Sequence, residues 1–253
     1  MHLQGHAAIV TGGASGLGAA TAQRLASAGC RVAVLDINES AAAVSAQRIG
    51  GIGVACDVGD AASAEAAVAK ALDVHGPARI LVNCAGVGTA GRIVGRDGPM
   101  PLAAFERVIR INLIGSFNLL RLAAADMVQL DPLEDGERGV IVNTASIAAF
   151  EGQVGQPAYA ASKAGVVGMT LPAARELARV GVRVVTIAPG LFHTPMVEGL
   201  PPEVQQNLAG SIPFPQRLGL PEEYAALVEH IATNRFINGE TIRLDGALRM
   251  PPR

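Results

Sequence analysis

Apolar runs of strand length alternate with segments of helical periodicity along the whole chain. A run of four to eight apolar residues is typical of a buried strand, and apolar residues every three or four positions are typical of a helix packed on a sheet. The pattern predicts strands at 6–11, 31–36, 53–57, 79–85, 139–146, 182–189 and 240–246. It predicts helices at 16–28, 39–49, 61–75, 105–128, 157–180 and 221–233.

Strand–helix–strand repetition places parallel strands side by side, joined by right-handed helical crossovers. We therefore expect residues 1–253 to form a single-domain α/β fold: a Rossmann-type doubly wound parallel sheet with helices on both faces. The run RILVNCA agrees, because a strand buried on both faces has no polar alternation. Pro172 falls inside the helix predicted at 157–180, where we expect a kink or a break because proline costs a regular helix about 3 kcal/mol.

Three longer stretches interrupt the alternation, at 86–101, 129–139 and 190–219. The third is the longest and follows the end of a predicted strand. Parallel α/β sheets bind their ligands in the loops beyond the carboxyl ends of the strands. We therefore expect residues 190–219 to be an insert that contacts the substrate.

Composition narrows the class of protein. Half of the 253 residues are hydrophobic and only 3% are aromatic, which favours helices packed closely on a sheet over an aromatic-rich binding module. The net charge of -2 gives no reason to expect nucleic acid or an anionic membrane surface as a partner. We also expect no membrane span, because the sequence has no run of about 18 uncharged apolar residues.

The three cysteines, Cys30, Cys56 and Cys84, are widely spaced and lie at predicted strand boundaries. We interpret them as buried free thiols, which favours a reducing compartment. The first residues, MHLQGHAAIV, lack the basic and apolar regions of a signal peptide. Together these features predict a cytoplasmic protein, and we expect no metal site.

The first predicted strand runs into TGGASGLG, which places Thr11, Gly12, Gly16 and Gly18 in the spacing TGxxxGxG. Glycines at this point let the chain turn tightly and let a pyrophosphate approach the N–H groups at the start of the next helix. Asp36 ends the second strand, where a carboxylate accepts hydrogen bonds from both ribose hydroxyls and repels a 2′-phosphate. The pattern predicts NAD rather than NADP.

Two further strand ends belong to the same predicted nucleotide site. Asp57 and Val58 follow the third strand and could meet the adenine ring. After the fourth strand, the segment Asn83–Gly86 is small enough for its backbone to pass close to the adenosine side of a cofactor.

Tyr159 and Lys163 stand four residues apart on a predicted helix, so their side chains share one face. A phenol has a pKa of about 10, but a neighbouring ammonium and an oxidised nicotinamide both favour phenolate. Lowering the pKa by roughly 3 units takes about 4 kcal/mol. Ser146 ends the fifth strand and could hydrogen-bond a substrate oxygen, and Asn112 could bind a water that connects Lys163 to solvent.

Taken in order, TGxxxGxG, the Asn83–Gly86 turn, Asn112, Ser146, YxxxK and Pro189-Gly190 resemble the short-chain dehydrogenase/reductase family over essentially the whole chain. The resemblance implies that Tyr159 is the general acid/base and that Lys163 holds the nicotinamide ribose and lowers the tyrosine pKa. It implies that Ser146 positions the alcohol or carbonyl and that Asn112 completes a proton relay. The positions that it implies for the cofactor are Gly12, Ser15, Gly16, Leu17, Gly18, Asp36, Asp57, Val58, Cys84, Ala85, Gly86, Tyr159, Lys163, Pro189, Gly190, Phe192 and Thr194.

One turn departs from the common family pattern, because it has NCAG where many members have NNAG. We expect this exchange to be neutral, since the backbone makes the contacts with the cofactor.

Longer stretches, such as VNTASIAAFEGQVGQPAYAASKAGVVGM and INGETIRLDGALRM, resemble the branch of the family that oxidises short-chain and branched 3-hydroxyacyl-CoA thioesters and some hydroxysteroids. This resemblance implies an acyl-CoA substrate, a place in fatty acid metabolism and a homotetramer. Pro157, His193 and the 86–101 loop depart from that branch.

Two alternatives stay open. One is oxidation of a hydroxysteroid or another secondary alcohol in an apolar pocket, for which the candidate residues are Phe150, Phe192, Met196, Leu200 and Phe214. The other is a nucleotide-binding or structural subunit that has lost the chemistry. Neither composition nor spacing gives a role for Gln153 or His193.

Overall fold

A parallel seven-stranded sheet forms the centre of the computed structural model, which describes residues 1–96 and 98–252. Its spatial order is β3-β2-β1-β4-β7-β8-β9, so the chain builds outward from β1 and then returns to β4 on the other side. This reversal between β1 and β4 creates the crevice in which doubly wound sheets bind ligands. The strands are β1 (Ala7–Thr11), β2 (Arg31–Asp36), β3 (Ile52–Ala55), β4 (Ala78–Asn83), β7 (Gly139–Thr144), β8 (Val182–Pro189) and β9 (Thr241–Leu244).

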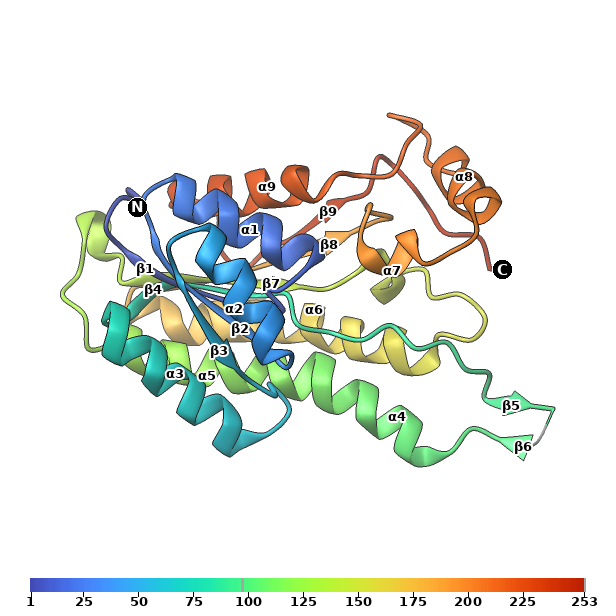
Figure 1. Cartoon of the computed structure of the whole chain (residues 1–253), viewed down its shortest axis with the longest axis horizontal. Helices are drawn as coiled ribbons and strands as arrows, with labels where there is room; N and C mark the ends of the chain where they lie inside the picture. The colour runs from blue at the N-terminus through green and yellow to red at the C-terminus, as the bar shows by residue number, and fades with distance from the viewer. Residues whose placement is uncertain (97, 253) are drawn as a thin grey trace.

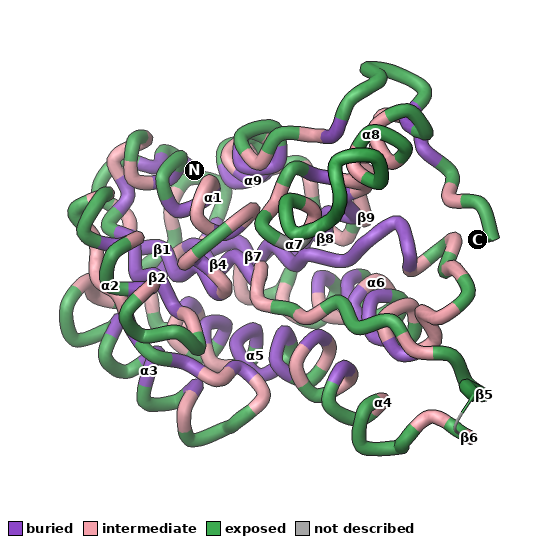
Figure 2. The backbone as a smooth tube through the Cα atoms, turned by 45° about the vertical axis from the view of Figure 1, so that its right-hand side comes forward, coloured by how far each residue is buried: buried purple, intermediate pink, exposed green. Residues whose placement is uncertain are grey.

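Helices cover both faces of the sheet, as the sequence predicts (Figure 1). Val10 and Val34 belong to a core cluster shared with α1, α2 and α9, whereas Ile9 and Leu35 belong to a second cluster shared with α3 and α5. Figure 2 shows the strands as a buried centre within more exposed helices and loops. The helices are α1 (Gly16–Ser27), α2 (Glu39–Arg48), α3 (Ala61–His75), α4 (Leu102–Ile109), α5 (Gly115–Met127), α6 (Pro157–Ala178) and α9 (Pro221–Thr233).

The structure refines two expectations about helices. The long helix predicted at 105–128 is present, but it consists of α4 and α5 joined by a π-helical turn at Arg110–Ile114. Of the kink or break expected at Pro172, the break does not occur, because α6 continues through this residue. Pro172 and Gly168, whose carbonyl would lose its hydrogen-bond donor, are both exposed, so water can solvate that carbonyl.

The interrupting stretches contain short elements that the periodicity does not reveal, and the 129–139 stretch contains a 3-10 turn at Glu134–Gly136. The 86–101 segment forms the hairpin β5 (Val94–Gly95) and β6 (Gly98–Pro99). The 190–219 insert contains α7 (Pro195–Glu198) and α8 (Pro202–Gly210). Each element is too short for its apolar spacing to distinguish a helix or strand from a loop.

The segment Leu102–Met127 is long and apolar enough to cross a membrane by length and composition alone. Its most apolar 18-residue window has a mean hydropathy of 1.3, and half of that window is buried inside the protein. The packing of this segment against β4 and α6 therefore accounts for the apolar side chains that are buried.

A row of buried polar residues crosses the sheet just below the carboxyl ends of its strands. Thr11, Asn83, Asn143 and Thr186 are lateral neighbours on β1, β4, β7 and β8. The Asn83 amide donates to Asn143 Oδ1 at 2.9 Å, and Thr11 Oγ1 accepts from the N–H of Ala85 at 3.1 Å. These side chains hold the carboxyl ends of the neighbouring strands level with one another, where the connecting segments begin.

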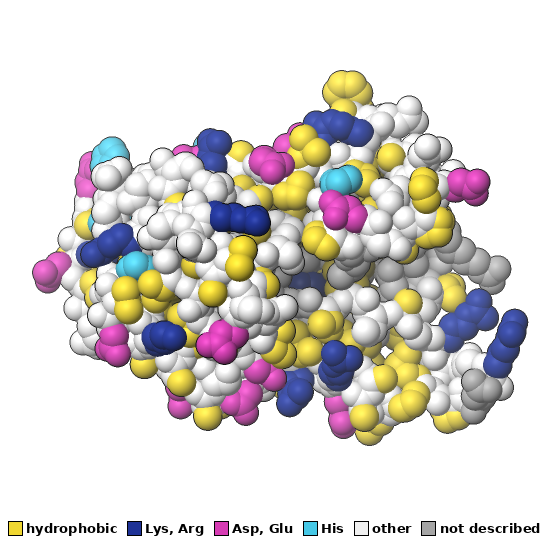
Figure 3. Space-filling model, viewed as in Figure 1, with side chains coloured by type: hydrophobic (Ala, Val, Ile, Leu, Met, Phe, Trp, Pro, Cys, Tyr) yellow, Lys and Arg dark blue, Asp and Glu magenta, His cyan; other side chains and the backbone are white. Residues whose placement is uncertain are grey.

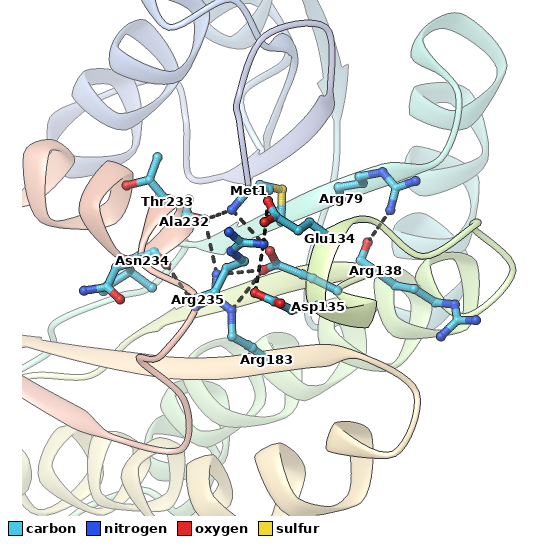
Figure 4. Close-up of polar contacts among 12 residues, drawn as sticks. Met1, Arg79, Glu134, Asp135, Arg138, Arg183, Ala232, Thr233, Asn234 and Arg235 are labelled. Carbon is cyan, nitrogen blue, oxygen red and sulfur yellow. Dashed lines mark hydrogen bonds and ion pairs between the residues drawn. The ribbon is translucent and has the colours of Figure 1, made fainter.

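A buried ion cluster lies at the opposite, amino end of the sheet (Figure 4). The amino group of Met1 is 3.2 Å from Glu137 Oε2 and donates to the carbonyl of Ala232 at 3.0 Å. Arg183 donates twice to Glu137 Oε1, at 2.8 and 2.9 Å. The cluster joins the first residue to β8 and α9, and it leaves the carboxyl end of the sheet to the candidate site.

Candidate active site

The glycine-rich turn after β1, which we call the glycine cradle, comprises residues 12–18, and neighbouring backbone packs closely against two of its glycines. Gly12 has a φ of +62°, and a Cβ added to it would lie 2.8 Å from Ala85 Cα. A Cβ on Gly18 would lie 2.2 Å from the Gly12 carbonyl oxygen. α1 begins after an exposed Ser15 whose side chain makes no capping bond, and its first turn contains no acidic residue. The N–H groups of this turn are therefore available to an anion, as a pyrophosphate site requires.

Asp36 lies beside this cradle, as the sequence predicts. Its carboxylate accepts hydrogen bonds from the N–H of Ala14 at 3.2 Å and from the N–H of Asn38 at 3.0 Å. These bonds orient the carboxylate and use only part of its acceptor capacity. The remaining lone pairs fit the two hydroxyls of a ribose.

The turn after β3 is held from within the protein. Val58 is buried and packs so closely on α5 that a Cβ on Gly115 would lie 2.6 Å from its Cγ2. Asp57 Oδ1 accepts from the N–H of Gly59 at 2.9 Å. The Val58 side chain is thus part of the core, and only its backbone can meet a nucleotide.

The turn after β4 approaches the residues proposed for chemistry. The N–H of Cys84 donates to the carbonyl of Thr11 at 3.2 Å, which joins this turn to the strand that carries the glycine cradle. A Cβ on Gly86 would lie 3.2 Å from Asn112 Oδ1 and 3.5 Å from Lys163 Nζ. Gly86 therefore allows the turn to pass beside both side chains.

Lys163 is 5% exposed and projects from α6 toward the carboxyl end of β7. Its ammonium donates to the carbonyl of Thr144 at 2.8 Å and lies 5.8 Å from the ring centroid of Tyr159. Burial lowers the pKa of Lys163 to about 8, and the neighbouring Cys84 acts in the opposite direction. The lysine thus lies beside Tyr159, as the spacing YxxxK predicts.

Tyr159 lies near Ser146 at the same edge of the sheet. Burial raises the pKa of Tyr159, and a hydrogen bond with the Ser146 side chain acts in the lowering direction. Lys163 therefore does not by itself give a low tyrosine pKa. Ser146 Oγ accepts from the N–H of Ala148 at 3.1 Å, so its own O–H can serve as a donor, to Tyr159 or to a substrate oxygen.

Asn112 lies in the π-helical turn and is completely buried. Its amide donates to the carbonyl of Val87 and to Ser162 Oγ, both at 3.0 Å, and its Oδ1 accepts from the N–H of Val87 at 2.8 Å. These bonds hold the segment after β4 against α6. One lone pair of Oδ1 remains for a water, and the unusual turn at this position agrees with the frequent occurrence of π-bulges at functional sites.

Comparison with known proteins agrees with this geometry. A model of the short chain dehydrogenase family matches residues 6–205. Two proteins called 3-hydroxyacyl-CoA dehydrogenase type-2 are similar along nearly their whole length. The one from Bos taurus is 50% identical (99% of this chain, 97% of the relative), and the one from Drosophila melanogaster is 53% identical (96% and 97%).

The chain belongs to the short-chain dehydrogenase family. The crystal structure of 3-hydroxyacyl-CoA dehydrogenase type-2 from Mycobacterium avium superimposes with a TM-score of 0.93 at 44% identity, covering 98% of each chain. Family membership confirms the predicted fold and oxidoreductase class, and members of this family use nicotinamide cofactors.

In this short-chain dehydrogenase the start of the 190–219 insert contacts the glycine cradle. A Cβ on Gly16 would lie 3.5 Å from Thr194 Cγ2, and Thr194 is the residue before α7. Phe192 is buried, with its ring edge-on to Tyr224 at a centroid separation of 6.5 Å. Only the backbone of Phe192 can therefore face a cofactor.

The other apolar candidates whose side chains the structure describes lie in different surroundings from Phe192. Phe150 lies under the guanidinium of Arg243, at 5.1 Å from ring centroid to Cζ. Phe214 is 82% exposed and Leu200 is 38% exposed. The side chain of Met196 lies outside the described part of the chain. The apolar residue types alone did not indicate which of them would meet.

Two cavities flank the hairpin segment beside the amino end of α6, in the region that is hollowed in Figure 3. One of about 580 Å³ is lined by Arg92–Val94, by 152–157 and by Ala160, and one of about 430 Å³ is lined by 89–92, 95–96, 98–101, 104, 155 and 158. Both include residues adjacent to Tyr159. The sequence hinted at this place only through the divergence of the 86–101 loop.

The structure also accounts for the two residues to which the sequence assigns no role. Gln153 lines the larger cavity and donates from Nε2 to the carbonyl of Pro251 at 3.1 Å. His193 Nδ1 lies 3.2 Å from Glu198 Oε1, within the insert. Gln153 thus joins the cavity wall to the end of the chain, and His193 braces the turn before α7.

Proposed function

We propose that this chain is an NAD-dependent dehydrogenase that interconverts a short or branched 3-hydroxyacyl-CoA and the 3-ketoacyl-CoA. The observation that best supports this proposal is that Tyr159, Lys163 and Ser146 lie close together at the edge of the sheet that also bears the glycine cradle. The names of relatives that are 50% and 53% identical support the acyl-CoA part.

In this proposal Ser146 and Tyr159 hold the oxygen of the 3-hydroxyl group. The Ser146 O–H donates to it, and Tyr159 as phenolate removes its proton while the C–H hydrogen leaves as hydride. The nicotinamide, when bound, supplies the hydride acceptor. Lys163 adds the positive charge that favours phenolate and holds the nicotinamide ribose, and Asn112 holds a water of the proton relay.

NAD is favoured over NADP because Asp36 places a carboxylate beside the cradle, where a 2′-phosphate would be repelled. Gly12, Gly18 and the start of α1 would hold the pyrophosphate. Purified Tyr159→Phe tests the chemistry: it should bind NADH nearly as well as wild type and lose nearly all turnover of acetoacetyl-CoA. Substantial remaining turnover would refute Tyr159 as the base.

A second candidate substrate is a hydroxysteroid or another secondary alcohol, which the mainly apolar cavity beside Gln153 could accept. A panel of 3-hydroxyacyl-CoA thioesters and hydroxysteroids, followed by NADH absorbance, separates the two. Absence of turnover with every compound would favour a nucleotide-binding subunit without chemistry, although the assembled Ser146, Tyr159 and Lys163 argue against it.

We further propose a homotetramer in a reducing, cytoplasmic setting. Apolar side chains at Ile114 and Phe117 are each 51% exposed on the α4–α5 side, and Phe236 is fully exposed. Further copies of the chain would cover such surfaces. The cysteines are free in the structure, which suits a reducing compartment. Light scattering would test the tetramer, and a monomer at assay concentrations would refute it.

A further inference from the structure

Tyr224, the second of the two tyrosines in the chain, contacts the strand residue to which Lys163 is bonded. Tyr224 is completely buried in the first turn of α9. Its hydroxyl is 2.7 Å from Thr144 Oγ1, and Thr144 is the residue whose carbonyl accepts from the Lys163 ammonium at 2.8 Å. Cys84 completes the group, with its sulfur 3.6 Å from Thr144 Oγ1 and 3.8 Å from the Tyr224 hydroxyl.

These three side chains form a closed hydrogen-bonded ring. The Thr144 hydroxyl donates to the Cys84 sulfur, and the Cys84 thiol donates to the Tyr224 oxygen. The Tyr224 hydroxyl is then the donor to Thr144, so each group donates once and accepts once. Thr144 and Tyr224 are buried and Cys84 is partly buried, so the ring is satisfied without water and its bonds polarise one another. We call Cys84, Thr144 and Tyr224 the hydroxyl–thiol ring.

The ring connects parts of the molecule that are separate in the sequence. Cys84 lies in the turn after β4, Thr144 ends β7 and Tyr224 belongs to α9. α9 covers one face of the sheet and α6, which carries Lys163, covers the other (Figure 1). Thr144 therefore contacts both faces of the sheet: its hydroxyl bonds to Tyr224 on one face, and its carbonyl accepts from Lys163 on the other.

The ring also contacts the base of the substrate insert. Phe192, at the start of the insert, packs edge-on against Tyr224 and forms a bridge with Gly219 at its end. A Cβ on Gly219 would lie 2.8 Å from the Phe192 ring. Tyr224 thus contacts the insert through Phe192 and the lysine through Thr144.

We infer that Tyr224 is a positioning residue: through the hydroxyl–thiol ring it fixes the Thr144 carbonyl, which places the Lys163 ammonium beside Tyr159, and it joins that site to the base of the 190–219 insert. The inference rests on the proposed role of Lys163. The titratable groups around the ammonium in the described chain are Tyr159 on its own helix, Cys84 on the β4 turn and Tyr224 behind Thr144.

The composition makes a direct test available. The chain has no tryptophan, and burial raises the pKa of Tyr224 well above its ordinary value, so in the NAD complex, where the nicotinamide charge and the Lys163 ammonium both favour phenolate, ultraviolet absorbance of phenolate titrates Tyr159 first. Tyr224→Phe removes the hydroxyl but keeps the ring that packs on Phe192. Thr144→Val removes the same bond from the other side. Cys84→Ala opens the ring, whereas Cys84→Ser can close it again.

In Tyr224→Phe, Thr144→Val and Cys84→Ala we expect Tyr159 to form phenolate about three- to tenfold less readily, the range that one buried hydrogen bond supports. NADH should bind about three- to tenfold more weakly, because the ammonium that holds the ribose is less well placed. Cys84→Ser, which can close the ring again, should show a smaller shift than Cys84→Ala on both measurements.

Thr170→Val is the matched control. It removes a buried hydroxyl on the same helix as Lys163, bonded to Thr186 at 2.6 Å, without touching the ring. It should lower the free energy of unfolding while leaving the Tyr159 titration and NADH affinity unchanged. A wild-type titration and affinity in both Tyr224→Phe and Thr144→Val would overturn the inference, as would equal shifts in Thr170→Val.

The remaining outcomes are also decisive. If Tyr224→Phe does not fold, the contrast between Cys84→Ala and Cys84→Ser still tests the ring, and equal values for the two would overturn it. The phenolate titration needs neither substrate nor turnover. A wild-type protein without acyl-CoA activity would thus refute the proposed function and leave the test of the ring intact.

Discussion

The close approach of the glycine cradle to the β4 turn makes a quantitative prediction for Gly12→Ala. Two effects add. A positive φ of +62° disfavours an L side chain by about 1–2 kcal/mol. The new Cβ would also lie 2.8 Å from both Ala85 Cα and Ala85 N, and overpacking of this kind costs about 1–3 kcal/mol. We expect the free energy of unfolding to fall by about 2–5 kcal/mol.

Gly50→Ala separates the two effects. Gly50 has a nearly equal φ of +66°, and a Cβ there would meet nothing within 4 Å. The free energy of unfolding of Gly50→Ala should fall only by the cost of the positive φ, about 1–2 kcal/mol. Urea unfolding at one protomer concentration measures both losses, and NADH titration measures the cradle. Gly12→Ala should weaken NADH binding and Gly50→Ala should not, because of the two glycines only Gly12 belongs to the proposed pyrophosphate site.

The reasoning fails if the two variants lose equal stability, since the difference between them is the contact with Ala85. It also fails if Gly12→Ala binds NADH like wild type. An equal loss would mean that the β4 turn moves aside freely, although the N–H of Ala85 is bonded to Thr11 Oγ1.

Three further predictions concern charges. Asp36→Asn should reduce the preference for NADH over NADPH by about tenfold or more in competition binding, because the charge facing a 2′-phosphate is lost; an unchanged preference would exclude Asp36 as its source. The pKa of Lys163 falls to about 8 in the folded chain, so between pH 8 and its ordinary value of 10.5 the unfolded chain binds more protons. Wild-type stability should therefore rise over this window by at most about 3 kcal/mol relative to Lys163→Met in parallel urea titrations; parallel curves would contradict this. The hydrogen bond from Arg217 lowers the pKa of Glu223 to about 2. The stability that the ionised Glu223 carboxylate contributes is therefore present above pH 4.5 and is lost as the pH falls through 2. Because both side chains are more than 40% exposed, Glu223→Gln should cost less than about 1 kcal/mol at pH 7 and progressively less as the pH falls through 2.

The main elements of the fold could be predicted because each strand and helix is long enough to show its own periodicity. The strand runs are apolar at successive positions, and the structure buries both faces of the sheet, with Ile9 and Val10 in different core clusters. The cradle and the YxxxK pair were predictable for a related reason. Glycines at a strand end and two side chains four apart on a helix are local patterns, and the local geometry carries the consequence.

The features that could not be predicted depend on tertiary contacts. The π-helical turn inserts one residue into an apolar pattern that is otherwise helical, and Asn112 stabilises it by bonding to Val87 across the site. The effect of Pro172 depends on whether water reaches the carbonyl of Gly168. The larger cavity forms because Gly91 bonds to Gly155 and Val154 to Pro252. No sequence pattern encodes these pairs.

The exchange of NNAG for NCAG shows how a motif can be correct while its explanation is incomplete. From the sequence, the side chain at Cys84 is expected to be indifferent because the backbone meets the cofactor. In the structure the thiol occupies a place between Thr144 and Tyr224, where it accepts one hydrogen bond and donates one. An asparagine there brings two donors and two lone pairs into a space with one partner for each, and burial penalises the unpaired groups. The residue at this turn and the residue at position 224 must therefore suit each other.

We expect Cys84→Asn to lower the free energy of unfolding in the wild type. The loss should be smaller in the Tyr224→Phe background, where removal of the phenol oxygen makes room for the amide. Equal losses in the two backgrounds would show that the two side chains are independent.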